Sequence, residues 1–374
     1  MSSMRPSPPL PPLPPKILCI TALEAVTPLG FDAEQTCAAI RARVNRFAEH
    51  PFHMALVRDP ETETPEPLIA SLLSELDPDV EGLERLLQLA VPAFKALLAK
   101  AGLKRADLAH GALLLSLPTV EKNLEAEMHR DLAAALTGRL GLGPMKLVKT
   151  LHAGHTGVAT CLSEASKLLA SGDAAFCFVA GLETYHLQPR LEALDEAWRL
   201  KTQRATDGFM PGEGAVVLLV ETAAQATARK VKPLATVTDL GFGKEARPNG
   251  SDALSSGEGL GLALQPALAR PRLAGSAGRW LLCDLNGESY RAAEWGLVRA
   301  RLGESLDPIS ALTYPADCLG DTGAASGGLL IAYALHAFSR GYAPAGEALI
   351  WNASEDGGRS AMVVRPASAT MGKT

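Results

Sequence analysis

Short apolar runs alternate with helix-like stretches along most of this chain. Most of the runs lack the alternation of polar and apolar residues that marks a strand with one solvent-exposed face. Uninterrupted apolar runs of this kind are typical of sheets covered on both faces. Between several of them, apolar residues recur at helical spacing, as from Leu83 to Ala101. The predicted strands are Lys16–Leu23, Ala112–Leu117, Phe176–Ala180, Val216–Glu221, Val231–Gly241, Trp280–Cys283, Leu349–Asn352 and Ser360–Val364. This alternation predicts an α/β protein.

One pattern occurs twice. A glycine- and threonine-containing turn opens an apolar helical stretch, which ends in a glycine and is followed by a strand-like run. The turns are residues 154–157 and 320–323. The repeat predicts a layered α/β/α/β/α body built from two similar halves, residues 16–230 and 231–366. It also places His155 and Asp321 at the starts of the two buried helices, where we expect the chemistry of the site.

Composition limits the classes of function. With 47% hydrophobic and 21% charged residues, the chain should have a large core. A net charge of −5 and 5% aromatic residues argue against nucleic-acid binding. No apolar run approaches the ~18 residues of a membrane span. Six scattered cysteines and an N-terminus without a signal-peptide pattern favour the cytoplasm. Residues 1–15, with seven prolines, and 367–374 are predicted to be disordered or mobile tails.

Several segments resemble a known family. Ile20–Gly30 is similar to its opening strand and turn, and Ala170–Glu183 to a Gly-Asp-Ala segment with its following strand. Asp207–Ala215 resembles its most specific glycine-rich loop, and Gly320–Gly327 resembles a "GHTxAAxG" motif. Together they resemble the ketoacyl-acyl carrier protein synthases of the thiolase fold over nearly the whole chain. The two-half repeat is what this fold implies.

The catalytic positions do not follow the resemblance. The family uses a cysteine at the start of the first buried helix and two histidines that assist decarboxylation and condensation. Counting back from Gly172 places the cysteine position on His155, or on Gly154 with a one-residue slip. The histidine positions fall on Asn286 and Asp321, and the family's lysine before the second histidine has no counterpart. The resemblance therefore implies a pseudoenzyme that does not condense by the family mechanism.

The polar residues at these positions have alternative roles. His155 is either a nucleophile or base in a changed site, or a neutral histidine hydrogen-bonded at a helix start. Asp321 either caps its helix or pairs with His155, which would raise the histidine pKa. Glu288, near Asn286, is expected in a polar, largely acidic pocket. We expect no metal and no cofactor, because His152 and His155 lack further ligands at zinc-like spacing.

Three further positions are assigned to the pocket. Gly154 opens the first turn, and Asp356 falls where the family has a gating phenylalanine. Cys318 precedes the second turn and is the best remaining thiol that could face the pocket, although it lacks a histidine partner. Cys161 should be buried and inert.

Three functions remain open at this point. The first is a non-condensing partner subunit, resembling the chain-length factors that pair with an active ketosynthase. The second is an adaptor acting through protein contacts. The third is an acyltransferase-family enzyme with altered chemistry around His155, Asn286 and Asp321. The resemblance implies a homodimer, or a heterodimer with a related ketosynthase, and an acyl carrier protein or other protein as client. Phe176–Ala180 is the predicted interface strand.

Overall fold

The computed structural model describes residues 17–56, 64–119, 131–202, 205–251, 253–271 and 278–367. The predicted tails lie outside these ranges, except for Ala367. Most strands form a ten-stranded sheet in the order β10-β9-β11-β12-β8-β1-β7-β6-β4-β5. The strands of the first half are β1 (Leu18–Val26), β4 (Gly111–Leu117), β5 (Leu147–His152), β6 (Phe176–Thr184) and β7 (Glu213–Glu221). Those of the second are β8 (Ala235–Lys244), β9 (Arg279–Cys283), β10 (Ile309–Thr313), β11 (Ala348–Ala353) and β12 (Gly358–Pro366).

The two groups of five strands have the same pairing. In the first, β4 is parallel to β5 and β6, and antiparallel pairs follow from β6 to β7 and from β7 to β1. In the second, β9 is parallel to β10 and β11, and antiparallel pairs follow from β11 to β12 and from β12 to β8. The halves join where Leu18–Ile20 pairs with Ala235–Val237. The predicted repeat of two similar halves is confirmed.

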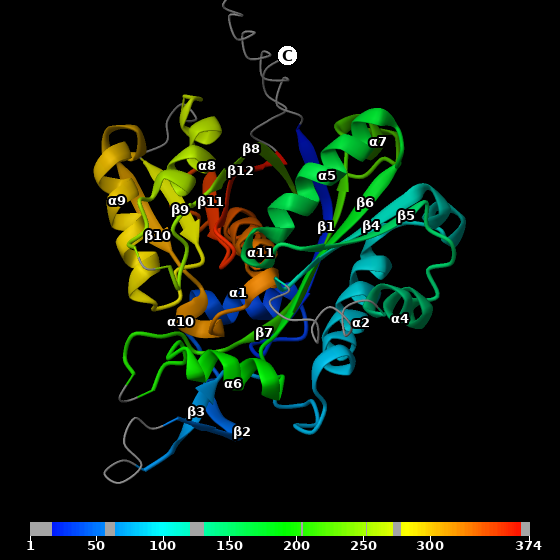
Figure 1. Cartoon of the computed structure of the whole chain (residues 1–374). Coiled ribbons are helices and arrows are strands. Elements are labelled where there is room, and N and C mark those ends of the chain that lie inside the picture. Colours follow the sequence, from blue (N-terminus) through cyan, green and yellow to red (C-terminus); the bar gives the residue numbers. More distant parts are fainter. Residues whose placement is uncertain are drawn as a thin grey trace, which may run out of the picture.

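Helices form three layers around these strands. α5 (Gly157–Ser171) and α11 (Ser326–Ser339) contact each other and share one buried cluster with the inner sheet faces of both halves. α2 (Gly82–Ala101) and α4 (Leu132–Leu140) cover the outer face of the first half. α8 (Glu258–Leu268) and α9 (Ser289–Leu306) cover that of the second. Figure 1 shows α11 near the centre, with the two outer pairs on opposite sides. This is the predicted five-layer α/β/α/β/α arrangement.

The remaining elements are short. They are α1 (Ala33–Arg41), α6 (Gln188–Glu196), α7 (Ala223–Ala228), α10 (Ala316–Leu319) and the 3-10 turns η1 (Arg105–His110), η2 (Gly154–Thr156) and η3 (Gly323–Ala325). Within the described ranges, no helix combines the length and the apolar character needed to cross a membrane.

A two-stranded hairpin, β2 (Ala48–Ala55) and β3 (Glu66–Ala70), projects beside α6 (Figure 1). Its inner face carries buried histidines. The Nδ1 of His50 accepts from the backbone of His53 at 3.0 Å, so its Nε2 is free to donate to Nδ1 of His186, 2.9 Å away. His186 Nε2 then donates to Pro78 O at 2.7 Å. These contacts need both His50 and His186 to be neutral.

The prediction that Phe176–Ala180 is an edge strand at the interface is wrong. Phe176–Ala180 belongs to β6, which lies between β4 and β7 and is buried along its whole length. The crossover through α5 carries the chain past β4, so β6 pairs on the inner side of β4 and β5 is left at the edge. Among the described residues, β5 is paired only on its β4 side.

Candidate functional site

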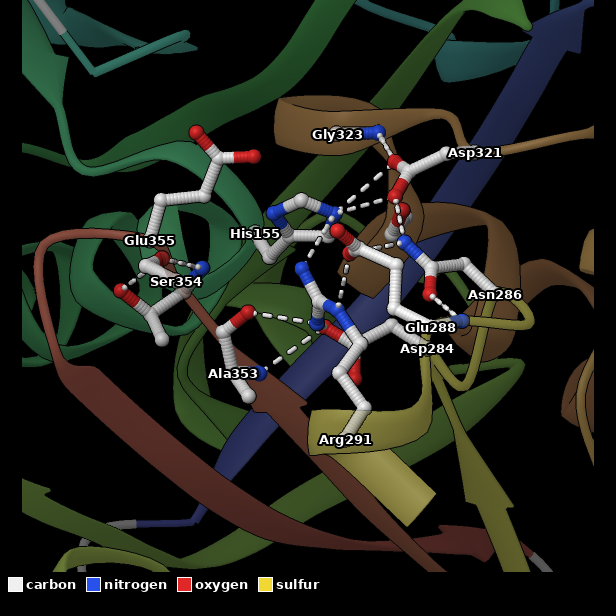
Figure 2. Close-up of polar contacts among 12 residues, drawn as sticks. His155, Asp284, Asn286, Glu288, Arg291, Asp321, Gly323, Ala353, Ser354 and Glu355 are labelled. Atoms are coloured by element: carbon white, nitrogen blue, oxygen red, sulfur yellow. Dashed lines mark hydrogen bonds and ion pairs between the residues drawn. The ribbon is translucent and has the colours of Figure 1, made fainter. Parts of the chain in front are cut away.

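The two repeated turns meet at the centre of the molecule. η2 carries His155 to the start of α5, and η3 follows Asp321 at the start of α11. His155 Nε2 lies 2.8 Å from Asp321 Oδ1 and 3.1 Å from Oδ2. Both residues are only 3% exposed. Figure 2 shows the two side chains pointing toward each other from the two halves, so the sequence repeat has brought its two polar positions into direct contact.

Asp321 is the acceptor at the centre of a hydrogen-bond network. Besides His155, its carboxylate accepts from Asn286 Nδ2 at 2.6 Å, from Tyr185 Oη at 3.2 Å and from the backbone N–H of Gly323 at 2.7 Å. The last bond caps the turn before α11, so Asp321 has both of the roles weighed from the sequence. The three predicted site residues, His155, Asn286 and Asp321, therefore form one contiguous cluster.

The pair is ionic. Burial by itself would raise the pKa of Asp321, but the charges of His155 and Arg291 and the hydrogen bonds it accepts hold that pKa well below its usual range. Burial by itself would lower the pKa of His155, but the Asp321 carboxylate reverses this and the pKa is raised. A protonated imidazole whose Nε2–H is donated to Asp321 has no lone pair there for attack or for proton abstraction. This arrangement disfavours His155 as nucleophile or base.

Arg291, which sequence reasoning missed, lies under the pair. Its Nη1 donates to Ala353 O at 2.7 Å and lies 3.3 Å from Asp284 Oδ2, and its Nε lies 3.4 Å from Glu288 Oε2. Asn286 Nδ2 also reaches Glu288 Oε2, at 3.0 Å. The sequence signal that could have found it is the dense run of polar residues from Asn286 to Glu294, which follows a buried strand.

Glu288 lies in the cluster, as predicted, and connects it to Arg199. Arg199 Nε donates to Glu288 Oε1 at 2.8 Å, and its Nη1 lies 2.8 Å from Glu355 Oε1. Asp356 does not line the site, which corrects its predicted place in the pocket. Its side chain is half-exposed, pairs with Lys244 and accepts from the backbone of Gly358 at 2.8 Å across its own turn.

Comparisons with known proteins agree with this architecture. Similar solved structures include an oxazolomycin ketosynthase domain from Streptomyces albus JA3453, with a TM-score of 0.72 and 16% identity over 93% of this chain and 75% of that one. A β-ketoacyl synthase from Burkholderia phymatum STM815 has a TM-score of 0.70 and 16% identity over 94% and 99% of the two chains. The ishigamide ketosynthase/chain length factor has a TM-score of 0.65 and 21% identity over 93% and 99%. The chain has the thiolase-like fold of the ketosynthases. No protein-family model matches its sequence, and no curated protein does.

The thiols of this ketosynthase-like chain are not activated. All six cysteines are free and buried, and burial raises the pKa of each. Cys318 lies in α10 among core side chains and does not line the cavity beside Asp321, which corrects its predicted place in the pocket. Cys283 lines that cavity instead. Gly154 is in the first turn, as predicted, with φ +51°, and an added Cβ would lie 3.2 Å from Thr119.

The cavity beside the cluster is small. Asn286, Asp321 and Leu319 are among its lining residues, and its volume is about 20 Å³. A single water needs roughly 10–15 Å³ by this measure, so the space holds about one water. Of the residues that the structure describes, His155 does not line this cavity. No group of three or more metal-ligating side chains is found among those residues either.

Proposed function

We propose that this chain is a non-condensing, ketosynthase-like subunit that acts by pairing with a related ketosynthase. The observation that carries the proposal is the buried His155–Asp321 ion pair at the start of α5. The resemblance puts a reactive thiol at that helix start, and a protonated histidine held by a carboxylate cannot replace it as a nucleophile. The absence of an activated thiol among the six cysteines supports the same conclusion.

The edge strand β5 supports a pairing role. Each of its residues is half-buried or exposed, Val148 is 39% exposed, and Lys149 is its only Lys, Arg, Asp or Glu residue. An unprotected edge strand with few charges is a surface on which another strand can pair. The resemblance implies dimer contacts near the first catalytic turn, and β5 leads directly into η2. One similar structure is described as a ketosynthase/chain length factor, and we propose such a partner here, in the cytoplasm, with an acyl carrier protein as client.

A second candidate is an acyltransferase-family enzyme with altered chemistry around His155, Asn286 and Asp321. The raised pKa of His155 favours it, because a histidine held protonated suits a general acid rather than a base. Acyl transfer to a carrier protein that is lost in His155→Ala but retained in Asp356→Asn would favour this candidate over the partner-subunit proposal.

The pairing proposal is tested by co-expression with candidate ketosynthases and size-exclusion chromatography with mass measurement. We expect a heterodimer that is lost in Val148→Glu, since a charge on β5 disrupts pairing at that edge. Leu262→Glu is the control, because Leu262 is 43% exposed on α8 and lies away from β5. A heterodimer that survives Val148→Glu, or a chain that stays monomeric with every candidate, contradicts the proposal.

A further inference from the structure

The β2–β3 hairpin is attached to the rest of the molecule largely through side chains. Its two strands form a sheet of their own, and within the described residues neither strand pairs with the ten-stranded sheet. Beyond the hairpin itself, the hydrogen bonds that β2 makes in that part of the chain run through the rings of His50 and His53. Leu56, the residue after β2, adds a backbone bond to the Asp195 carboxylate at 2.8 Å. A change in the protonation of these side chains can therefore weaken the attachment.

Protonation of His50 or of His186 disrupts one of these contacts. As a neutral ring, each offers Nδ1 as an acceptor and Nε2–H as a donor. A proton on His50 Nδ1 would face the backbone N–H of His53, 3.0 Å away. A proton on His186 Nδ1 would face the Nε2–H of His50, 2.9 Å away. Each added proton therefore places two donors against each other and adds positive charge at the contact.

The charged groups around the two rings leave both histidines neutral. Burial, the neighbouring histidine rings and Arg85 on α2 lower the pKa of His50 to about 3. Burial and Arg85 also lower the pKa of His186, although Pro78 O, Glu213 and Glu81 act in the opposite direction. Glu213 is already paired with Arg85, at 2.6 Å between Oε2 and Nε, so it is not free to form an ion pair with a protonated His186.

The third histidine of this region, His53, behaves differently because it faces a carboxylate. Its Nε2 lies 3.0 Å from Asp195 Oδ2, so a proton on His53 would keep that contact as an ion pair. Glu49, the remaining titratable residue of β2, is exposed. The contacts of β2 that acid disrupts are therefore those of His50 and His186.

β3 covers an apolar cluster beside the central site. Leu68 of β3 is fully buried. The other members of its cluster are Tyr185, Leu191, Leu194, Leu200 and Phe209. Tyr185 Oη donates to Asp321 Oδ1 at 3.2 Å. A hairpin that moves away from the rest of the molecule withdraws Leu68 and opens this cluster to water, next to the bond between Tyr185 and Asp321.

We propose that the β2–β3 hairpin detaches from the rest of the molecule when His50 and His186 are protonated, and so uncovers the apolar cluster around Tyr185. This step is independent of the proposed pairing at β5. In the detached hairpin, histidines have their ordinary pKa of about 6.5. The attachment is therefore complete above that pH and is weakened as pH falls. Between about pH 7.5 and about pH 5, His50 alone raises the equilibrium constant for opening about 30-fold, and His186 raises it further.

The test is hydrogen exchange of the full chain at about pH 7.5 and about pH 5, with protection factors corrected for the intrinsic pH dependence of exchange. A two-stranded hairpin is only marginally stable by itself in water, so its amides exchange when it detaches. We expect protection across β3 to fall at least about 30-fold in acid, while protection across β7 of the ten-stranded sheet falls much less. Equal losses in β3 and β7, or no loss in β3, would overturn the proposal.

Glutamine variants assign the response to the two histidines. A glutamine amide keeps one donor and one acceptor group and takes up no proton in this range. The double variant His50→Gln/His186→Gln should therefore lose the response to acid, and each single variant should show a smaller fall in β3 protection than the wild type. His336→Gln is the control, because His336 is half-buried on α11, and it should respond like the wild type. A double variant or single variants that respond as strongly as the wild type contradict the assignment.

Discussion

Replacing Asp321 by asparagine tests the buried ion pair with little change in shape. In the wild type the carboxylate accepts from His155, Asn286, Tyr185 and the Gly323 N–H. An asparagine has one acceptor oxygen, and its NH₂ would face one of these donors. Removing one partner of a buried ion pair costs about 3–5 kcal/mol of unfolding free energy. We expect Asp321→Asn to lose about that amount in urea-induced unfolding at neutral pH.

The loss should depend on pH. Because the folded pKa of Asp321 is lowered, its contribution is present above the ordinary carboxyl pKa of about 4 and is lost as pH falls through the lowered value. Because the folded pKa of His155 is raised, its contribution is complete below the ordinary histidine pKa of about 6.5 and is lost as pH rises through the raised value. The difference between wild type and variant should therefore be largest between these two ordinary pKa values and smaller in alkaline solution.

A matched control distinguishes the stability lost with the ion pair from the general effect of removing an acidic charge. Asp356→Asn removes a half-exposed carboxylate paired with Lys244, and should change the unfolding free energy by no more than about 0.5 kcal/mol. An Asp321→Asn variant that loses less than about 1 kcal/mol, or whose loss is no larger at about pH 5 than in alkaline solution, would refute the ion-pair reasoning.

Three other measurements follow from the same structure. A Cβ on Gly323, which has φ +40°, would lie 1.8 Å from Glu183 Oε2, so Gly323→Ala should cost at least about 2 kcal/mol of unfolding free energy. The control is Gly341→Ala, at φ +69° with no atom near the added Cβ, which should cost about 1 kcal/mol. Equal costs for the two variants would contradict the close contact between Gly323 and Glu183. Burial lowers the pKa of His50 to about 3 and also lowers that of His186, so their stabilising contribution should be lost as pH falls below about 6.5. Hydrogen-exchange protection factors across β2, corrected for the intrinsic pH dependence of exchange, should fall over that range. Protection factors that do not change with pH would contradict this. Iodoacetamide should label none of the six buried cysteines in the native protein and all of them after denaturation, as read by mass spectrometry; rapid native labelling of Cys318 would instead mark a reactive thiol.

The two-half fold and the meeting of His155 with Asp321 were predictable because both depend on local signals. A turn, an apolar helix and a following strand recur at both positions, and each polar residue is fixed at its helix start by the turn that contains it. Once the halves pack through α5 and α11, the two helix starts come together without further information.

The rest of the cluster depends on distant segments. Tyr185 lies 136 residues from Asp321 in sequence, and Arg199 lies 89 residues from Glu288. No local pattern predicts such contacts. Asp356 was misplaced because neighbouring residues in a turn point in different directions: Glu355 reaches Arg199, whereas Asp356 faces solvent. The order of the strands could not be predicted from the sequence either, because the side of β4 on which β6 pairs is set by the crossover through α5.

The most direct test of the proposed non-condensing role is a condensation assay with malonyl-loaded acyl carrier protein and an acyl primer. The purified chain, His155→Ala and Asp356→Asn are compared, each alone and together with an intact ketosynthase. We predict no condensation product from the chain alone, in any of the three forms, because the buried His155–Asp321 pair leaves no nucleophile at the start of α5. Product formed by the wild-type chain alone, retained in Asp356→Asn and abolished in His155→Ala, would contradict the assignment.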